Sequence, residues 1–152
     1  MDVKEFLRRI RTEQTELELM LLKKNNMIYI RALTFDKDKI NTSVSEDLSE
    51  MAIKNNALLL AIDRKIRQLQ KNQLRAYKMI NGLEDDNQRQ IMLMYYLTRK
   101  ESENSEITSP YSLDEVAEAL NFSNSYVKHL HGDALNVLRE MKKPYKTKKA
   151  LA

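Results

Sequence analysis

The feature that most constrains the fold is a long heptad pattern in the first half of the chain. Residues recur in alternating steps of four and three, mostly apolar with two polar interruptions, at Leu48, Ala52, Asn55, Leu59, Ile62, Ile66, Leu69, Gln73, Ala76, Ile80 and Leu83. This period predicts a helix whose seam faces another helix. We expect it to span about 48–81, with Gly82 as its C-terminal stop. Such a helix is roughly 50 Å long, too long for a small domain to cover.

The seam needs a partner, and the sequence leaves two possibilities open. A first helix is predicted over residues 3–33, where apolar residues form one stripe, and it could fold back on the seam as a hairpin. Alternatively, a second copy of the chain could cover the seam, with a dimer as the default. The residues that would then carry oligomerisation are Leu59, Ile62, Ile66 and Leu69.

The composition favours an all-α fold. The chain has two Gly, two Pro and 32% charged residues, and helices need few turn residues. Polar stretches without a period predict loops at residues 34–47 and 100–110, and a further helix is expected over residues 85–99. We therefore predict two parts: a helical hairpin or coiled-coil oligomerisation region, residues 1–83, and a C-terminal domain with a basic tail, residues 84–152.

The segment after the second predicted loop carries the clearest local signals. Ser112 and Glu115 have the spacing of a capping box that starts a helix. Asn121 tolerates the left-handed conformation that ends one, and Ser123 can cap the next. Two short capped helices, a three-residue turn and the small Ala117 where the helices cross predict a helix-turn-helix.

Charge is distributed unevenly along the chain. Residues 123–152 carry seven Lys/Arg against two Asp/Glu, whereas residues 84–122 carry three against nine. A basic C-terminal end fits an acidic partner, with nucleic acid as the first candidate. Residues 1–83 carry 16 Lys/Arg against 11 Asp/Glu. We expect these charges to be spread along solvated helix faces without clustering, so that this part binds DNA weakly or not at all.

The stretch SLDEVAEALNFSNSYVKHLHGDALNVLRE resembles region 4 of bacterial sigma factors. The positions that match in kind are Ser112, Leu113, Glu115, Val116, Leu120, Val127, Leu130, Ala134, Leu135, Leu138 and Arg139. The resemblance covers about residues 84–141 and implies a DNA-binding helix-turn-helix. Primary sigma factors usually carry Arg-Glu and then Arg-Gln where this chain has Asn124, Ser125, Lys128 and His129, so a different base preference is expected.

The whole chain resembles phage late-transcription regulators of the RinA/ArpU kind. The resemblance implies a sequence-specific DNA-binding regulator that activates packaging and structural genes, beside host RNA polymerase, in the cytoplasm of a bacterial host. One alternative is a small terminase subunit, which also joins a helix-turn-helix to an oligomerising helical region. Another is an adaptor that binds RNA polymerase without contacting bases.

The candidate DNA-binding residues lie at the start of the second helix of the helix-turn-helix and in the basic tail. Outward positions near the start of this helix meet base edges in the major groove, and cations beyond it meet phosphates. The candidates are Ser123, Asn124, Ser125, Lys128, His129, Lys142, Lys143 and Lys146.

No pattern in the sequence predicts catalysis, a cofactor or a metal site. The chain has no Cys, and its two His, His129 and His131, would point in different directions from a helix. We expect His131, at the border of the apolar face, to have a packing role rather than a chemical one. No apolar stretch approaches the roughly 20 residues that a transmembrane helix requires, so no membrane association is expected.

Overall fold

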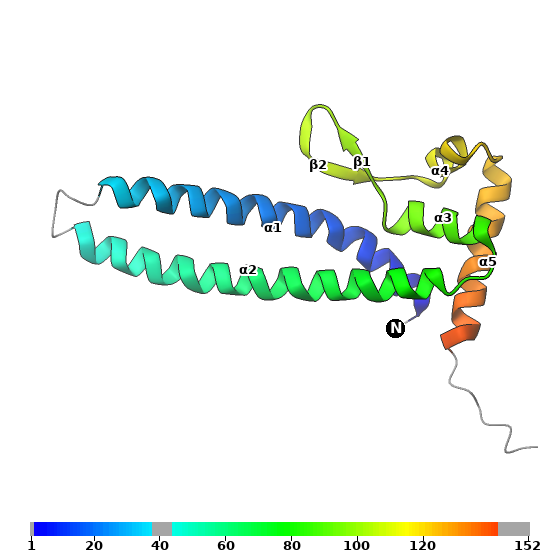
Figure 1. Cartoon of the computed structure of the whole chain (residues 1–152), viewed down its shortest axis with the longest axis horizontal. Helices are drawn as coiled ribbons and strands as arrows, with labels where there is room; N and C mark the ends of the chain where they lie inside the picture. The colour runs from blue at the N-terminus through cyan, green and yellow to red at the C-terminus, as the bar shows by residue number, and fades with distance from the viewer. Residues whose placement is uncertain (1, 38–43, 143–152) are drawn as a thin grey trace, which may run out of the picture.

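The computed structural model describes the backbone of residues 2–37 and 44–142, and the side chains of residues 2–26 and 50–142. Its elements are α1 (Val3–Lys37), α2 (Val44–Asn81), α3 (Asp86–Tyr96), β1 (Arg99–Ser102), β2 (Ser105–Pro110), α4 (Leu113–Leu120) and α5 (Asn124–Lys142). The two long helices α1 and α2 lie side by side and project from an end formed by α3, α4 and α5 (Figure 1). The predicted helical fold is confirmed, with one short β-hairpin in addition.

The heptad seam of α2 is covered by α1 of the same chain. Ile62, Ile66 and Leu69 are buried there together with Leu17 of α1, and Met20 packs against this cluster. Of the two partners that the sequence left open, the structure therefore contains the intramolecular one. Oligomerisation through the seam stays a prediction, and it would require α1 to leave side chains that it already covers.

Polar contacts also join the two long helices. Gln73, which interrupts the apolar seam, donates a hydrogen bond to Gln14 of α1. Lys24 Nζ of α1 lies 2.6 Å from Asp63 Oδ1 of α2. The polar position in the seam is thus paired within the chain, which stabilises this register of the hairpin over registers that would leave the amide unpaired.

The bounds predicted for the loop over residues 34–47 are wrong at both ends. Helix α1 continues to Lys37 and α2 begins at Val44, while residues 38–43 lie outside the described part of the chain. Thr, Ser, Asn and Asp favour turns, but each costs a helix well under about 1 kcal/mol relative to Ala. A composition of this kind is therefore compatible with helix when a long helix runs into it.

One core joins the long hairpin to the C-terminal helices. It consists of residues from α1, α2, the connection after α2, α3 and α5: Val3, Leu7, Ile10, Ala76, Ile80, Leu83, Met92, Tyr96, Ala134, Leu135 and Leu138. All are buried. The boundary predicted after residue 83 thus passes through a core with members on both sides, and we call this group the junction core.

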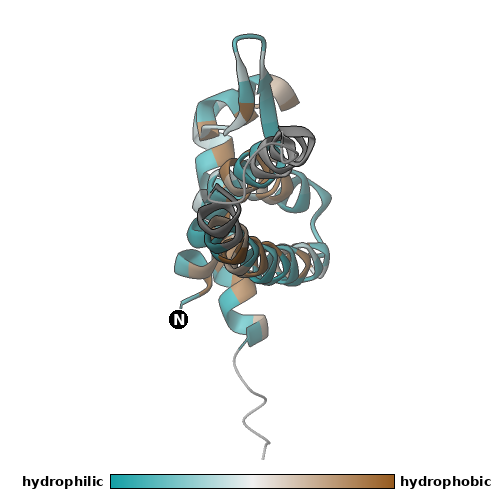
Figure 2. Ribbon diagram, turned by 90° about the vertical axis from the view of Figure 1, so that its left-hand side faces the viewer, coloured by the Kyte–Doolittle hydropathy of each residue, from teal (hydrophilic) through white to brown (hydrophobic). Residues whose placement is uncertain are grey.

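The stretch predicted as a loop over residues 100–110 is mostly a β-hairpin, and this prediction was wrong. Strands β1 and β2 pair antiparallel, with Arg99 opposite Pro110. The tip of the hairpin projects away from the helices and is hydrophilic (Figure 2). The predicted helix over residues 85–99 accordingly ends earlier, at Tyr96, where Leu97 caps it.

The β-hairpin is attached to α1 by polar contacts. Arg99 donates hydrogen bonds to Thr15 Oγ1 of α1 at 2.5 Å and to the Thr108 carbonyl at 2.9 Å. The Thr108 amide in turn donates to Glu18 Oε2 of α1 at 2.9 Å. Hydrogen bonds to charged groups are the stronger kind. They hold a strand pair that has no apolar alternation for a sequence pattern to reveal.

Candidate nucleic-acid interface

Helix α4 begins and ends as the sequence predicts. Ser112 Oγ accepts a hydrogen bond from the Glu115 amide at 3.2 Å, and the Ser112 amide donates to Glu115 Oε1 at 3.3 Å, so both halves of the capping box are formed. Asn121 ends the helix with φ 57° and ψ 39°, in the left-handed region that Asn tolerates better than most residues. The chain can therefore turn sharply into the next helix.

Helix α5 begins immediately after this turn. Ser123 Oγ accepts a hydrogen bond from the Tyr126 amide at 3.2 Å, which confirms Ser123 as the N-cap. Val127 and Leu130 of α5 are buried, and Ala117 of α4 is completely buried with them in one cluster. A larger side chain at position 117 would force α4 and α5 apart, since interiors of this kind are close-packed.

The packing of α5 determines which of its side chains face solvent. Because Val127 and Leu130 point inward, Ser125, Lys128 and His129 are exposed, as is Asn124 at the first position of the helix. The side chains of Lys128 and His129 are 61% and 73% exposed. The predicted base-contacting residues therefore lie together on the free surface at the N-terminal end of α5.

Two of these exposed residues lie near acids of the same chain. Lys128 Nζ is 3.9 Å from Asp114 Oδ1 of α4, and His129 Nε2 is 3.2 Å from Asp133 Oδ2, one turn further along α5. Exposed ion pairs contribute about 0–1 kcal/mol because water and salt screen them. Neither contact is strong enough to prevent the side chain from binding another group.

His131 has the packing role that the sequence predicts. Its Nε2 lies 2.7 Å from the hydroxyl oxygen of Tyr96, and the two rings are stacked with centroids 5.6 Å apart. Burial lowers the pKa of His131, with Lys4 contributing in the same direction, and burial raises the pKa of Tyr96. His131 is therefore a half-buried residue that packs against Tyr96, and no group of three or more His, Asp or Glu that could hold a metal ion occurs among the residues that the structure describes.

Of the predicted tail residues, the structure describes only Lys142. Lys142 is the last residue of α5, it is exposed, and it lines a pocket together with Arg9 and Arg75. Lys143 and Lys146 lie outside the described residues. Their contact with DNA stays a prediction.

The structure adds three residues to the exposed face of α5 that the sequence analysis did not single out. Tyr126 is 40% exposed, packs edge-on against Phe122 and accepts a hydrogen bond from Asn87 of α3. Gly132, which is partly exposed, and Asn136, which is exposed, continue the line of residues that begins at Ser125 and His129, in steps of four, three and four. The helical period of the sequence alone could have placed Gly132 and Asn136 on this face.

The comparison with known families agrees with this geometry. Residues 85–140 match the Sigma-70, region 4 family, and the match begins at the N-cap of α3 and covers α3, α4 and nearly all of α5. No curated protein and no solved structure matched the chain. Residues 85–140 thus contain a helix-turn-helix that is similar to sigma factor region 4, a DNA-binding domain in that family.

The described helices also lack the length of apolar sequence that would be needed to span a bilayer.

Proposed function

We propose that this chain is a sequence-specific DNA-binding transcription regulator that reads base edges with α5. The observation that carries the proposal is the capped α4–turn–α5 unit, which buries Val127 and Leu130 and so presents Ser125, Lys128 and His129. In helix-turn-helix proteins the second helix lies in the major groove, with its N-terminal residues on the bases.

Each exposed residue has a chemistry suited to DNA. Asn124 can pair with adenine and Lys128 with guanine, and a good bidentate pair of this kind discriminates against a wrong base by about 1–3 kcal/mol. Ser125 and His129 can each exchange one further hydrogen bond with a base or a phosphate. Ser123 uses its oxygen as the N-cap acceptor, which leaves its hydroxyl hydrogen for a phosphate oxygen.

The basic C-terminal end supports the same proposal. Lys142 lies at the far end of α5 from the base-reading residues, and Lys143 and Lys146 follow it in the sequence. Cations outside the groove contact phosphates, which adds affinity without sequence information. We therefore assign base reading to the start of α5 and phosphate binding to the basic segment after it.

The biological role that we propose is activation of phage late genes, for packaging and structural proteins, together with host RNA polymerase in the bacterial cytoplasm. The resemblance of the chain to phage late-transcription regulators supports this role. A region 4 module is also compatible with binding to the polymerase itself. This second contact would bring the enzyme to promoters that α5 selects.

The proposal is tested by separating specific from non-specific DNA binding. Lys128→Ala and Asn124→Ala should each weaken binding to a duplex selected by the protein by about 5- to 150-fold, which corresponds to 1–3 kcal/mol, while binding to random duplex changes little. Changing Lys142, Lys143 and Lys146 to Ala should weaken binding to both duplexes alike. Fluorescence anisotropy titrations measure both affinities. Val137→Ala, at an exposed position on the side of α5, is the control and should change neither.

Two results would contradict this function. Equal losses on both duplexes for Lys128→Ala would mean that α5 does not read bases, and an adaptor that binds RNA polymerase would then be the better explanation. Large ring-sized particles in light scattering would favour a terminase subunit.

A further inference from the structure

The outer face of α2 carries a row of cations. Arg64, Arg67, Lys71, Arg75 and Lys78 follow one another in steps of three or four residues, and all five are exposed. At 3.6 residues per turn these positions lie within an arc of about 80°, on the side of the helix opposite the seam with α1. The expectation that the positive charge of residues 1–83 is not clustered is therefore wrong for α2. We call these five residues the α2 basic row.

Few acids lie near the α2 basic row along the sequence of α2. Asp63 is the only acid between residues 51 and 81, and its carboxylate pairs with Lys24 of α1. No acid of the described ranges forms an ion pair with Arg64, Arg67 or Lys71. Like charges three or four residues apart repel and cost a helix a few tenths of a kcal/mol per pair. The row thus destabilises the free protein slightly, and an external polyanion would relieve the repulsion.

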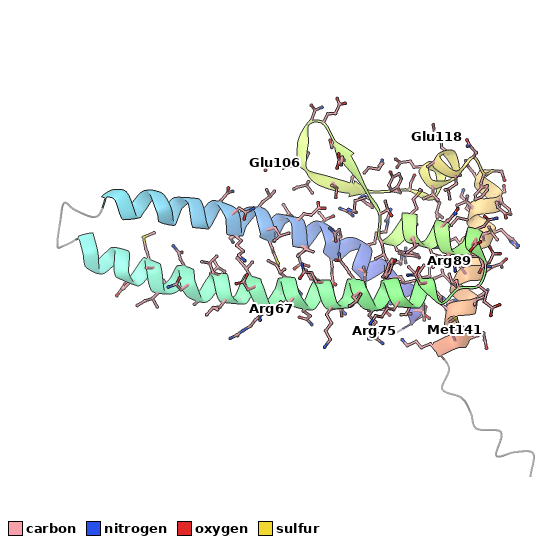
Figure 3. The ribbon with its side chains drawn as sticks, in the orientation of Figure 1. Arg67, Arg75, Arg89, Glu106, Glu118 and Met141 are labelled. Atoms are coloured by element: carbon pink, nitrogen blue, oxygen red, sulfur yellow. The ribbon has the colours of Figure 1, made fainter. Side chains whose placement is uncertain are left out.

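The α2 basic row extends toward the C-terminal end of α5. Arg67 and Arg75 lie on the side of α2 that faces away from α1, and Met141 of α5 lies beyond Arg75 (Figure 3). Arg75 and Lys142 line the same pocket, where the Arg75 guanidinium lies 5.1 Å from the centre of the Phe6 ring. The row therefore meets the end of α5 from which the basic tail continues.

We propose that the α2 basic row is a second contact surface for duplex DNA and that it binds the phosphate backbone without reading sequence. The first and last residues of the row are 14 positions apart, which is about 21 Å of helix, or roughly six base pairs of duplex. Arg is enriched and Lys depleted in protein–protein interfaces, whose centres are usually apolar or aromatic. The row has neither kind of anchor among its five members. A regular line of phosphates is the partner whose charge and shape fit it best.

Helix α5 begins beside α4, whereas α2 passes the other end of α5 (Figure 1), and Arg67 and Arg75 of the α2 basic row point away from α1 (Figure 3). The row would accordingly hold a segment of duplex other than the base pairs in contact with α5, either on bent DNA or on a second duplex. This inference rests on the proposed function only in taking DNA as the ligand. The two surfaces can be tested separately, because one carries specificity and the other only charge.

The test uses the full chain with Arg64, Arg67 and Lys71 changed to Gln, a residue that also favours helix. The matched control removes the same charge elsewhere, by changing the exposed residues Arg8, Lys23 and Lys54 to Gln. Circular dichroism verifies that both variants are folded. Binding to a random-sequence duplex is measured at several salt concentrations. The slope of log affinity against log salt should become shallower by up to about 2.7 in the row variant, at 0.9 per lost phosphate contact, and by less than about 1 in the control.

Each alternative result would overturn the proposal. An unchanged slope would mean that the row is only solvated. Equal changes in both variants would mean that total charge, and not the row, matters. If DNA binding is unchanged while binding to RNA polymerase or self-association in light scattering is lost, the partner is a protein. The variants of α5 identify failure of the proposed function independently, because they alone should change the preference for selected over random duplex.

Discussion

Gly132 lies partly exposed on α5, in line with the exposed residues Ser125, His129 and Asn136. Glycine within a helix costs about 0.5–1 kcal/mol relative to alanine. A Cβ atom at this position would meet nothing within 4 Å, so no contact inside the chain requires glycine here. Glycine also permits a close approach of the backbone to a ligand. A helix that lies in a DNA groove needs its backbone to approach the DNA closely on this face.

We therefore expect Gly132→Ala to stabilise the free protein by about 0.5–1 kcal/mol and, at the same time, to weaken binding to the selected duplex by several-fold. Urea unfolding and anisotropy titrations measure the two effects. Gly82→Ala is the matched control, because its Cβ would lie only 3.2 Å from the Met79 carbonyl oxygen and should give no gain in stability. Unchanged or tighter DNA binding by Gly132→Ala would show that nothing approaches α5 closely at this point.

Local signals explain why several residues were predicted correctly. The caps at Ser112 and Ser123 and the left-handed Asn121 depend on atoms no more than a few residues away, so the sequence alone is sufficient for them. Tyr126 was not singled out because its hydrogen bond depends on tertiary structure. Its hydroxyl oxygen accepts from Asn87, which lies 39 residues earlier.

At the scale of elements, the period of α2 predicts that another helix covers its seam. It does not predict whether that helix belongs to the same chain or to a second one. A heptad seam is equally well filled by α1 or by a second chain, because knobs-into-holes packing does not depend on the chain that supplies the knobs. The β-hairpin could not be predicted for a related reason. Its strands lack apolar alternation, and it is held by Arg99 and Thr108 through contacts to α1.

Substitution of Ile62 by Asp distinguishes the two partners of the seam. Ile62 is 6% exposed, so the change places a carboxylate in the apolar contact between α1 and α2 and should cost at least about 3 kcal/mol. With the seam filled within the chain, the fall in thermal midpoint should be the same at protein concentrations that differ tenfold. Leu60→Asp, at a position 58% exposed, is the control and should change little.

Thermal unfolding by circular dichroism, with light scattering on the same samples, provides the measurement. Two results together would show that a second chain fills the seam. The thermal midpoint of Ile62→Asp would rise with protein concentration, and light scattering would find the unchanged protein as an oligomer but the variant as a monomer.

At the scale of the whole molecule, the junction core makes the long hairpin and the helix-turn-helix depend on each other. Leu7 of α1, Ile80 of α2 and Leu138 of α5 are all buried in it. The predicted division after residue 83 came from a change in sequence pattern. Such a change marks the end of an element, whereas the extent of a core depends on which distant segments pack together.

We expect the chain to unfold in a single transition, and Leu7→Ala to destabilise both parts together by about 2–5 kcal/mol. The reason is that Leu7 is completely buried between the hairpin and α5. Calorimetry tests this, since the calorimetric and van't Hoff enthalpies agree for a single transition. Leu19→Ala, at a position of α1 that is 50% exposed, is the control. Two separate transitions, with only one moved by Leu7→Ala, would establish residues 1–83 and 84–152 as independent domains.

The attachment of a long hairpin to α5 through one packed core also has a mechanical consequence. Helix α2 has 38 residues and is therefore about 57 Å long, whereas α5 has 19 residues. The helical hairpin of α1 and α2 is thus a long lever, and one end of it is packed against α5, the helix that we assign to the DNA groove. A tilt of about 10° at that end would displace the far end of such a lever by about 10 Å. Small changes in how α5 sits on DNA would thus become large movements at a point remote from it, where another protein could detect them.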